Sequence, residues 1–159
     1  MKTKIEIGDV FEVKLPDGRK FIQYVANDVS MLNSSVIRSF KKQYAENQKI
    51  NVEEIVRGDV NFYAHVFLKN GCKLGYWNKI GHTDEIGRLD MLFRDSHDYG
   101  KPAIKISEKW YVWKINGPFI DVGKLTDHNQ RAEIGVVVPP DSVVHRIQTG
   151  KYDFVYPGY

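Results

Sequence analysis

The sequence contains a single cysteine, Cys72, among 159 residues, so it cannot form an intramolecular disulfide. Metal sites built from several thiolates are excluded for the same reason. A lone free thiol fits a reducing compartment, and we expect a cytoplasmic protein. Cys72 itself follows an Asn-Gly pair and is interpreted as a small apolar side chain rather than as a nucleophile.

Long apolar runs are also lacking, because no stretch approaches the roughly 18 apolar residues of a membrane-spanning helix. Near the N-terminus, Glu6 and Asp9 come before any apolar segment of a signal peptide, which predicts no export by such a signal. The phosphate-binding patterns GxGxxG and GxxxxGK[ST] are absent from the sequence. We expect one domain over residues 1–159, a length that buries roughly 70% of the unfolded surface.

Net charge is small, at +3 from 23 basic and 20 acidic residues, and does not by itself indicate a nucleic-acid partner. The charges are unevenly spread, because residues 82–98 carry only two arginines against five acids. These acids are Asp84, Glu85, Asp90, Asp95 and Asp98. One short segment is therefore acidic within a mildly basic chain.

Alternation of apolar and polar residues, with short apolar runs, predicts seven or eight short strands from nine candidate segments. They fall among residues 10–15, 20–26, 35–40, 62–68, 72–77, 103–106, 110–115, 119–122 and 135–138. A Pro-Asp-Gly turn at residues 16–18 predicts a hairpin between the first two segments. The pair Asn70 and Gly71 predicts a second hairpin with a type I′ turn.

Two short helices are predicted from their end signals. Asn51 with Glu54 three residues later indicates a helix over residues 52–57, and Pro140 with Gly150 indicates another over residues 140–149. Between residues 83 and 101 the only possible helical turn lies at residues 86–93, and the aromatic end, residues 152–159, is expected to pack back on the core. The predicted fold class is α+β, mainly β, with a strongly twisted antiparallel sheet or small barrel and two short helices.

The candidate catalytic and metal-ligating groups lack the spacing that their chemistry requires. Ser96, His97 and Asp98 are adjacent, and neighbouring side chains on a strand point to opposite faces, so they are interpreted as a polar loop. His82 with Asp84 and Glu85 does not have the HExxH spacing of a zinc site. We expect no metal, no cofactor and no enzymatic activity. A hydrolase whose catalytic residues are not recognisable in the sequence is a further alternative.

Residues 69–79 combine three lysines with two aromatic residues, which are the residue types of a platform for single-stranded nucleic acid. The residues are Lys69, Lys73, Tyr76, Trp77 and Lys79. No arginine lies in this window to read bases in bidentate fashion, and rings at strand spacing are more often core residues. A small-barrel nucleic-acid-binding module is therefore kept as the alternative function.

Two blocks of the sequence resemble the immunity protein 26 family. GDVFEVKLPDGR at residues 8–19 resembles its Gly-Asp opening with an Asp-Gly turn, and GYWNKIGH at residues 75–82 resembles its Gly-x-Trp-x-x-Ile-Gly pattern. The likeness covers residues 8–82 well and residues 99–159 loosely. The same blocks also have a structural interpretation, with glycines permitting a bulge and with Trp77 and Ile80 filling the core beside Phe11 and Val13.

Immunity proteins of such families occur in bacterial polymorphic-toxin and contact-dependent competition loci. The resemblance implies a cognate toxin domain as partner, neutralised inside the producing cell by occlusion rather than catalysis. The acidic segment is then the expected contact surface, with Phe93 and Tyr99 as aromatic anchors and Lys79 and His82 as outward contacts. Many toxin domains are basic nucleases, which suits these acids. The net charge of +3 counts against an acidic nucleic-acid mimic and leaves a non-nuclease or acidic toxin open.

Overall fold

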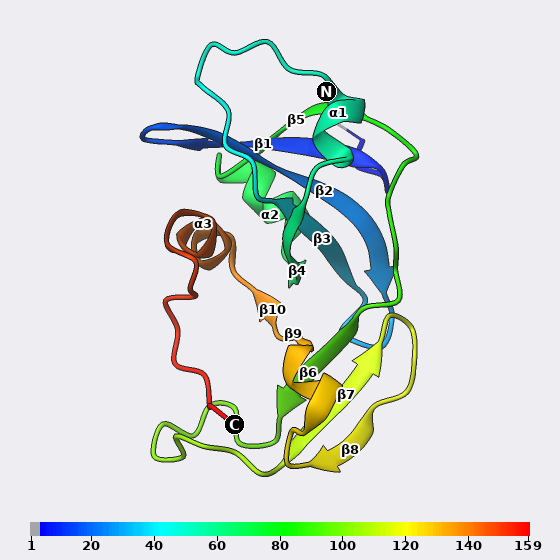
Figure 1. Ribbon diagram of the computed structural model, residues 1–159, viewed down its shortest axis with the longest axis vertical. Helices are drawn as coiled ribbons and strands as arrows, with labels where there is room; N and C mark the ends of the chain where they lie inside the picture. The colour runs from blue at the N-terminus through cyan, green and yellow to red at the C-terminus, as the bar shows by residue number, and fades with distance from the viewer. Residues whose placement is uncertain (1–3) are drawn as a thin grey trace.

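Two mixed β-sheets form the framework of the computed structural model, which describes residues 4–159 (Figure 1). The six-stranded sheet has the order β10 (Val137–Val138), β4 (Val60–Val66), β3 (Ser34–Phe40), β2 (Gly18–Asp28), β1 (Asp9–Leu15), β5 (Asn78–His82). The four-stranded sheet has the order β8 (Ile120–Gly123), β7 (Trp110–Lys114), β6 (Leu92–Ser96), β9 (Glu133–Ile134). The pairs β10–β4 and β6–β9 are parallel, and the other pairs are antiparallel.

The mainly β, α+β class predicted from the sequence is confirmed, in the form of two open sheets rather than a small barrel. The helices are α1 (Val52–Val56), α2 (Leu68–Lys73) and α3 (Pro140–Thr149), with a 3₁₀ turn, η1, at Asp127–Arg131. No helix within residues 4–159 is long and apolar enough to cross a membrane.

Elements with local sequence signals form as predicted. β1 and β2 make the expected hairpin around residues 16–17, with Phe11 opposite Ile22. Helix α1 begins after Asn51, whose side chain accepts the backbone N–H of Glu54 at 3.1 Å. Helix α3 ends at Gly150, which has a left-handed φ of 86°.

The predicted second hairpin is wrong, because helix α2 replaces its turn. Asn70 and Gly71 lie inside α2, and the following residues return to the sheet as β5, beside β1 instead of β4. A Cβ on Gly71 would lie 1.9 Å from Cζ2 of Trp77, so glycine here makes room for the indole. The indole N–H donates to the carbonyl oxygen of Leu68 at 3.1 Å, which ties the loop to the helix.

Two other interpretations fail between residues 83 and 138, and a third is confirmed only in part. Residues 103–106 form no strand, and only Ile106 makes a single bridge, to Gly158. Residues 86–93 contain no helical turn, and strand β6 begins at Leu92. The run 135–138 is split, because the chain leaves the four-stranded sheet at Gly135, packed against Trp113, and joins the six-stranded sheet as β10.

Both faces of the six-stranded sheet are covered. One face packs against α2, α3 and the aromatic residues of the C-terminal tail, which packs back as predicted (Figure 1). Trp77 lies in this core with Phe11 and Val13, as expected. Ile80 instead packs on the opposite face, where α1 and the loop before it form a second core.

The two sheets are joined by a buried hydrogen-bonded cluster around Asp28. Its carboxylate accepts from His65 Nε2 at 2.8 Å, from the Trp113 indole at 3.0 Å and from the backbone N–H of Asn116 at 2.9 Å. Burial raises the pKa of Asp28, but these hydrogen bonds outweigh it, and the pKa lies below its ordinary value. Burial lowers the pKa of His65, although its hydrogen bond to Asp28 acts in the opposite direction.

Candidate functional site

The two family-like blocks, far apart in the sequence, lie side by side in the sheet. β1 pairs with β5 in antiparallel fashion, with Asp9 opposite His82 and Val10 opposite Gly81. The register shifts after Val10, which marks a bulge in the pair. Because β5 is the last strand of the sheet, the paired blocks form one of its edges.

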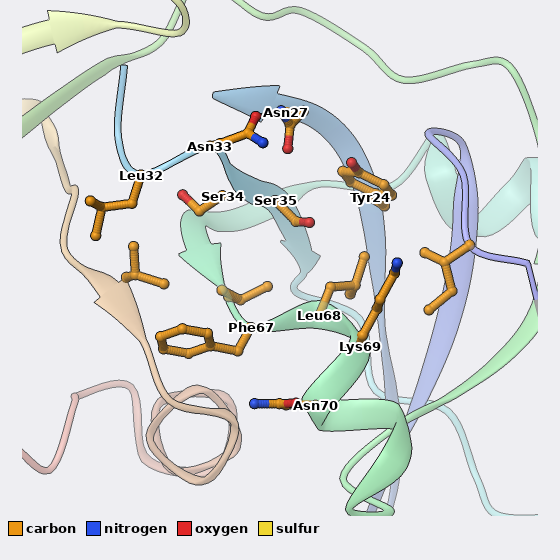
Figure 2. Close-up of a pocket in the computed structure, with 13 residues that line it drawn as sticks. Tyr24, Asn27, Leu32, Asn33, Ser34, Ser35, Phe67, Leu68, Lys69 and Asn70 are labelled. Carbon is orange, nitrogen blue, oxygen red and sulfur yellow. Dashed lines mark hydrogen bonds between the residues drawn. The ribbon is translucent and has the colours of Figure 1, made fainter. Parts of the chain in front are cut away.

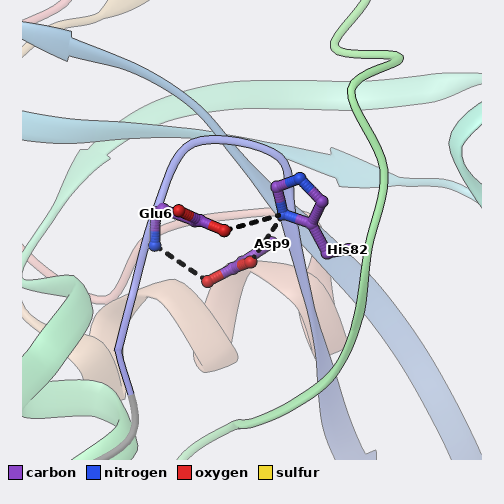
Figure 3. Close-up of side chains that lie close together, drawn as sticks. All are labelled: Glu6, Asp9 and His82. Carbon is purple, nitrogen blue, oxygen red and sulfur yellow. Dashed lines mark hydrogen bonds and ion pairs between the residues drawn. The ribbon is translucent and has the colours of Figure 1, made fainter.

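Asp9 is the centre of a polar cluster at this edge (Figure 3). Its side chain is fully buried, yet its Oδ1 accepts from His82 Nδ1 at 2.8 Å and lies 3.1 Å from the ammonium of Lys79. Its Oδ2 accepts the backbone N–H of Glu6 at 2.9 Å. A Cβ on Gly8 would lie 2.7 Å from Cε1 of His82, so only glycine allows the ring to approach Asp9 in this way.

His82 is held between carboxylates on both sides of its ring. Its Nε2 donates to Oδ1 of Asp84 at 3.0 Å, and its Nδ1 lies 3.9 Å from Oε1 of Glu6. Hydrogen bonding to Asp9, and then to Asp84, raises the pKa of His82 above its ordinary value. The ring, with its side chain 35% exposed, is therefore both fixed and accessible.

The segment after β5 is irregular but is attached to the sheet by buried polar side chains. Nε2 of Gln23 lies within hydrogen-bonding distance of the carbonyl oxygens of Gly8, Thr83 and Glu85, at 3.2, 3.3 and 3.1 Å. Arg38 donates to the side-chain oxygen of Gln23 at 2.9 Å and to the same Glu85 carbonyl at 3.0 Å. Gln23 and Arg38 therefore hold the beginning of the acidic segment against the sheet.

The exposed acids of this segment are paired with bases. Both carboxylate oxygens of Glu85 accept from Arg57, at 2.9 and 2.7 Å, and Asp90 accepts from Arg88 at 2.6 Å. These hydrogen bonds lower the pKa of Glu85 and of Asp90. Asp84, with its side chain 99% exposed, is the most accessible carboxylate of the three.

Three of the expected contact residues lie inside the protein. Phe93 is fully buried between His65 and Trp113. Asp95 is buried beside Tyr111 and Tyr156, whose hydroxyls donate to it, and burial raises its pKa. Asp98, also buried, accepts from the hydroxyl of Ser107 at 2.8 Å. Their burial removes Phe93, Asp95 and Asp98 from the surface that a partner can touch.

Tyr99 is exposed but belongs to a different part of the molecule. Its ring packs against those of Phe154 and Tyr156 in the C-terminal tail, with centroids 6.4 and 5.5 Å away. The neighbouring Ser96, His97 and Asp98 form no triad, because His97 pairs with Asp121 while Ser96 and Asp98 both contact Ser107. The structure thus divides the acidic segment into an exposed first half and a buried second half.

The lysine–aromatic platform considered for nucleic acid is not formed. Trp77 is 2% exposed, and α2 occupies the place of the hairpin. Lys69 instead lines a cavity of about 450 Å³ between α2 and the end of the β2–β3 hairpin, together with Tyr24 and Ser35 (Figure 2). Of the described residues that line this cavity, Lys69 is the one of a basic or acidic type.

Sequence reasoning did not single out Asp9, Gln23 and Arg38 as site residues. One signal for Gln23 is present in the sequence, because it shares a strand face with Phe21 and Val25 and is thus polar where the alternation calls for an apolar residue. A polar residue on a core face must have hydrogen-bonding partners. Here the partners are the backbone carbonyl oxygens of Thr83 and Glu85, at the beginning of the acidic segment.

The comparison with protein families agrees with the paired blocks. A family model described as Immunity protein 26 matches residues 6–100, which is more than half of the chain and includes Asp9, Gln23, His82 and Asp84. No curated protein and no solved structure gives a match. The matched region contains both blocks, the strands that they form and the segment attached to them. The chain belongs to the immunity protein 26 family.

Proposed function

We propose that this protein is a cytoplasmic immunity protein that binds the toxin domain of a polymorphic or contact-dependent competition system and blocks it by occlusion, without catalysis. The observation that carries the proposal is the family match over residues 6–100. A surface that is ordered before the partner arrives lowers the entropic cost of binding. The edge at β5 is such a surface.

We propose this edge, with the exposed first half of the acidic segment, as the contact surface. The β5 surface comprises Lys79, His82, Asp84, Glu85 and Asp90, with Arg57 and Arg88 as the partners of two of the acids. Figure 1 shows the segment after β5 running along one side of the molecule toward β6. Phe93, Asp95, Asp98 and Tyr99 lie outside this surface.

The β5 surface carries charges of both signs, not of one sign. Glu85 and Asp90 are paired with Arg57 and Arg88, and Lys79 is paired with the buried Asp9. Such a pattern guides the register of docking and disfavours wrong partners more than it adds raw affinity. A toxin with basic side chains suits Asp84 best, because this carboxylate is the most exposed and is paired only with a histidine.

Preorganisation supports the same proposal. Gln23 and Arg38 fix the backbone at residues 83–85 by hydrogen bonds from the buried side. A segment that is already ordered loses less conformational entropy on binding than a flexible loop. The cognate toxin therefore meets a surface whose side chains are positioned by the sheet.

The test is a stoichiometric inhibition assay with the purified toxin domain encoded immediately upstream of this gene. Occlusion predicts that residual toxin activity falls linearly and reaches zero at one equivalent of this protein, and that co-expression restores growth of a host that makes the toxin. Full protection at a tenth of an equivalent would contradict occlusion, because it requires turnover. An unaffected toxin at several equivalents would contradict the immunity function.

A further inference from the structure

We propose that Glu6, Asp9 and His82 bind one zinc ion at the junction of β1 and β5. One donor atom from each side chain can be chosen so that all three lie within 4.8 Å of one another. Nδ1 of His82 is 2.8 Å from Oδ1 of Asp9 and 3.9 Å from Oε1 of Glu6. Tetrahedral ligands at about 2.0 Å from zinc are about 3.3 Å apart, so small side-chain shifts suffice.

The donor set matches zinc in kind as well as in spacing. One imidazole nitrogen and two carboxylate oxygens are ligands that zinc accepts, and sites with three protein ligands leave a fourth position for water. Figure 3 shows the two carboxylates and the ring of His82 pointing toward one another. Because Glu6 and His82 are partly exposed, an ion can enter from solvent and keep a water ligand.

The groups around the three ligands are arranged as outer partners of a metal site. Histidine ligands of zinc usually donate their other ring N–H to a carboxylate, which fixes the tautomer and the ring orientation. Here Nε2 of His82 already donates to Asp84, which leaves Nδ1 facing Asp9 and Glu6. The second oxygen of Asp9 is fixed by the backbone N–H of Glu6, so Oδ1 points to the shared centre.

Lys79 is the group that competes with the ion. Its ammonium lies 3.1 Å from Oδ1 of Asp9, where it neutralises the buried carboxylate. The side chain is 28% exposed, so it has a path to solvent when zinc takes its place. Zinc binding therefore displaces the ammonium of Lys79 from Asp9 and releases the Nδ1 proton of His82 to solvent. Removing the lysine charge should strengthen it. A cluster that served only as a salt bridge would show no such gain.

The bound ion would connect the segment before β1 to the end of β5. Glu6 precedes β1, Asp9 is its first residue, and His82 is the last residue of β5. A ligand that binds the folded chain alone stabilises it in proportion to the logarithm of its concentration over Kd. Zinc should therefore raise Tm of the wild-type protein and leave Tm of a ligand variant unchanged.

The experiment is a calorimetric titration of the full-length, chelator-treated protein with zinc chloride. We expect one ion per chain, loss of binding in His82→Gln, and binding about fivefold tighter or more in Lys79→Met, since a repelling charge near the ion is removed. Asp84→Asn should weaken binding about 10-fold to 100-fold, as other outer-shell variants do. His97→Gln is the matched control, because His97 also pairs with an aspartate on the surface.

Three outcomes would overturn the proposal. They are no heat of binding for the wild type up to millimolar zinc, equal binding by His82→Gln and His97→Gln, or weaker binding in Lys79→Met. Circular dichroism and the urea midpoint of each variant establish that it is folded before titration. The toxin takes no part in this experiment, so its result is independent of the proposed function.

Discussion

The carboxylate of Asp9 accepts a hydrogen bond from Nδ1 of His82 at 2.8 Å, across the β1–β5 pair. The contact joins the two sequence blocks that resemble the family, one from each strand. It also places a fully buried carboxylate next to a partly exposed ring, on the edge from which the acidic segment departs. The blocks therefore both shape the sheet and fix the side chains beside the proposed contact surface.

Folding stability should depend on pH through His82. The pKa of this ring is raised in the folded protein above its ordinary value of 6.5, so its contribution is fully present below pH 6.5 and is lost as pH rises through the folded value. In chelator, we expect the stability difference between wild type and His82→Gln to be largest near pH 6 and to shrink by pH 9.

Urea unfolding at several pH values measures this difference. The control is His97→Gln, whose exposed ring contacts Asp121 at 3.0 Å. Asp121 lies in β8 of the four-stranded sheet, whereas the Asp9 cluster lies at the edge of the six-stranded sheet. A wild-type advantage over His82→Gln that grows with pH would refute the assigned direction of the pKa shift.

The side chain of Gln23 should control the order of the acidic segment. Gln23→Leu leaves the carbonyl oxygen of Thr83 without its side-chain donor and Nε of Arg38 without its acceptor, while the carbonyl oxygens of Gly8 and Glu85 keep their other donors. Each buried polar group left unsatisfied costs about 1–3 kcal/mol. We expect faster hydrogen exchange at residues 83–90 and lower global stability.

Exchange measured by mass spectrometry at peptide level reports the effect directly. Gln43→Leu is the matched control, because the amide of Gln43 is exposed and donates only to the carbonyl oxygen of Asp17. Unchanged exchange at residues 83–90 in Gln23→Leu would show that other contacts, such as the packing of Ile86 and Met91, hold the segment.

The effects on stability of substitutions at Gly71 and Trp77 should be coupled, because the two residues are in direct contact. Gly71→Ala places a methyl group 1.9 Å from the indole and should destabilise the protein by about 1–3 kcal/mol, as overpacking does. Trp77→Leu alone should also destabilise, by leaving a cavity. The double variant should be more stable than the sum of the two losses, by about 0.5–3 kcal/mol. Additive losses in a double-mutant cycle would mean that the two residues do not share this contact.

Removing the exposed acids should slow toxin association. The variant with Asp84, Glu85 and Asp90 replaced by serine leaves Arg57 and Arg88 without their acidic partners and His82 without Asp84 at the β5 surface. For a basic toxin we expect the association rate to fall about tenfold at low salt, with a smaller change in folding stability.

The control variant replaces Glu46, Glu108 and Asp121 by serine, which removes the same number of negative charges elsewhere on the exposed surface. Two of these acids also have basic partners, Lys124 and His97, so the comparison is matched. Equal slowing by both variants in stopped-flow measurements would assign the effect to net charge. Unchanged rates in the folded β5 variant would remove the site assignment.

The sequence predicted those elements whose signals are local. The β1–β2 hairpin depends on a turn and on alternation within 20 residues, and α1 and α3 depend on their own end residues. The failed hairpin had an equally strong local signal in Asn70 and Gly71. There the contact of Gly71 with Trp77 decides the outcome, because the indole needs the space next to the helix.

The site was only half predictable for a similar reason. Lys79, His82, Asp84 and Glu85 were predicted as contact residues because they are close together in the sequence and rich in charge. The burial of Phe93 depends on packing within the four-stranded sheet, against Trp113. The fixed position of the acidic segment depends on Gln23 and Arg38, which are about 45 to 60 residues away in the chain. No local pattern carries such long-range contacts.

The most direct measurement of the central claim is a calorimetric titration of this protein with the purified C-terminal domain of the protein encoded immediately upstream of its gene, the place expected for the toxin. The immunity function predicts one-to-one binding with a nanomolar Kd and loss of the domain's toxicity in the complex. No detectable heat at micromolar concentrations, with toxicity intact, would contradict it.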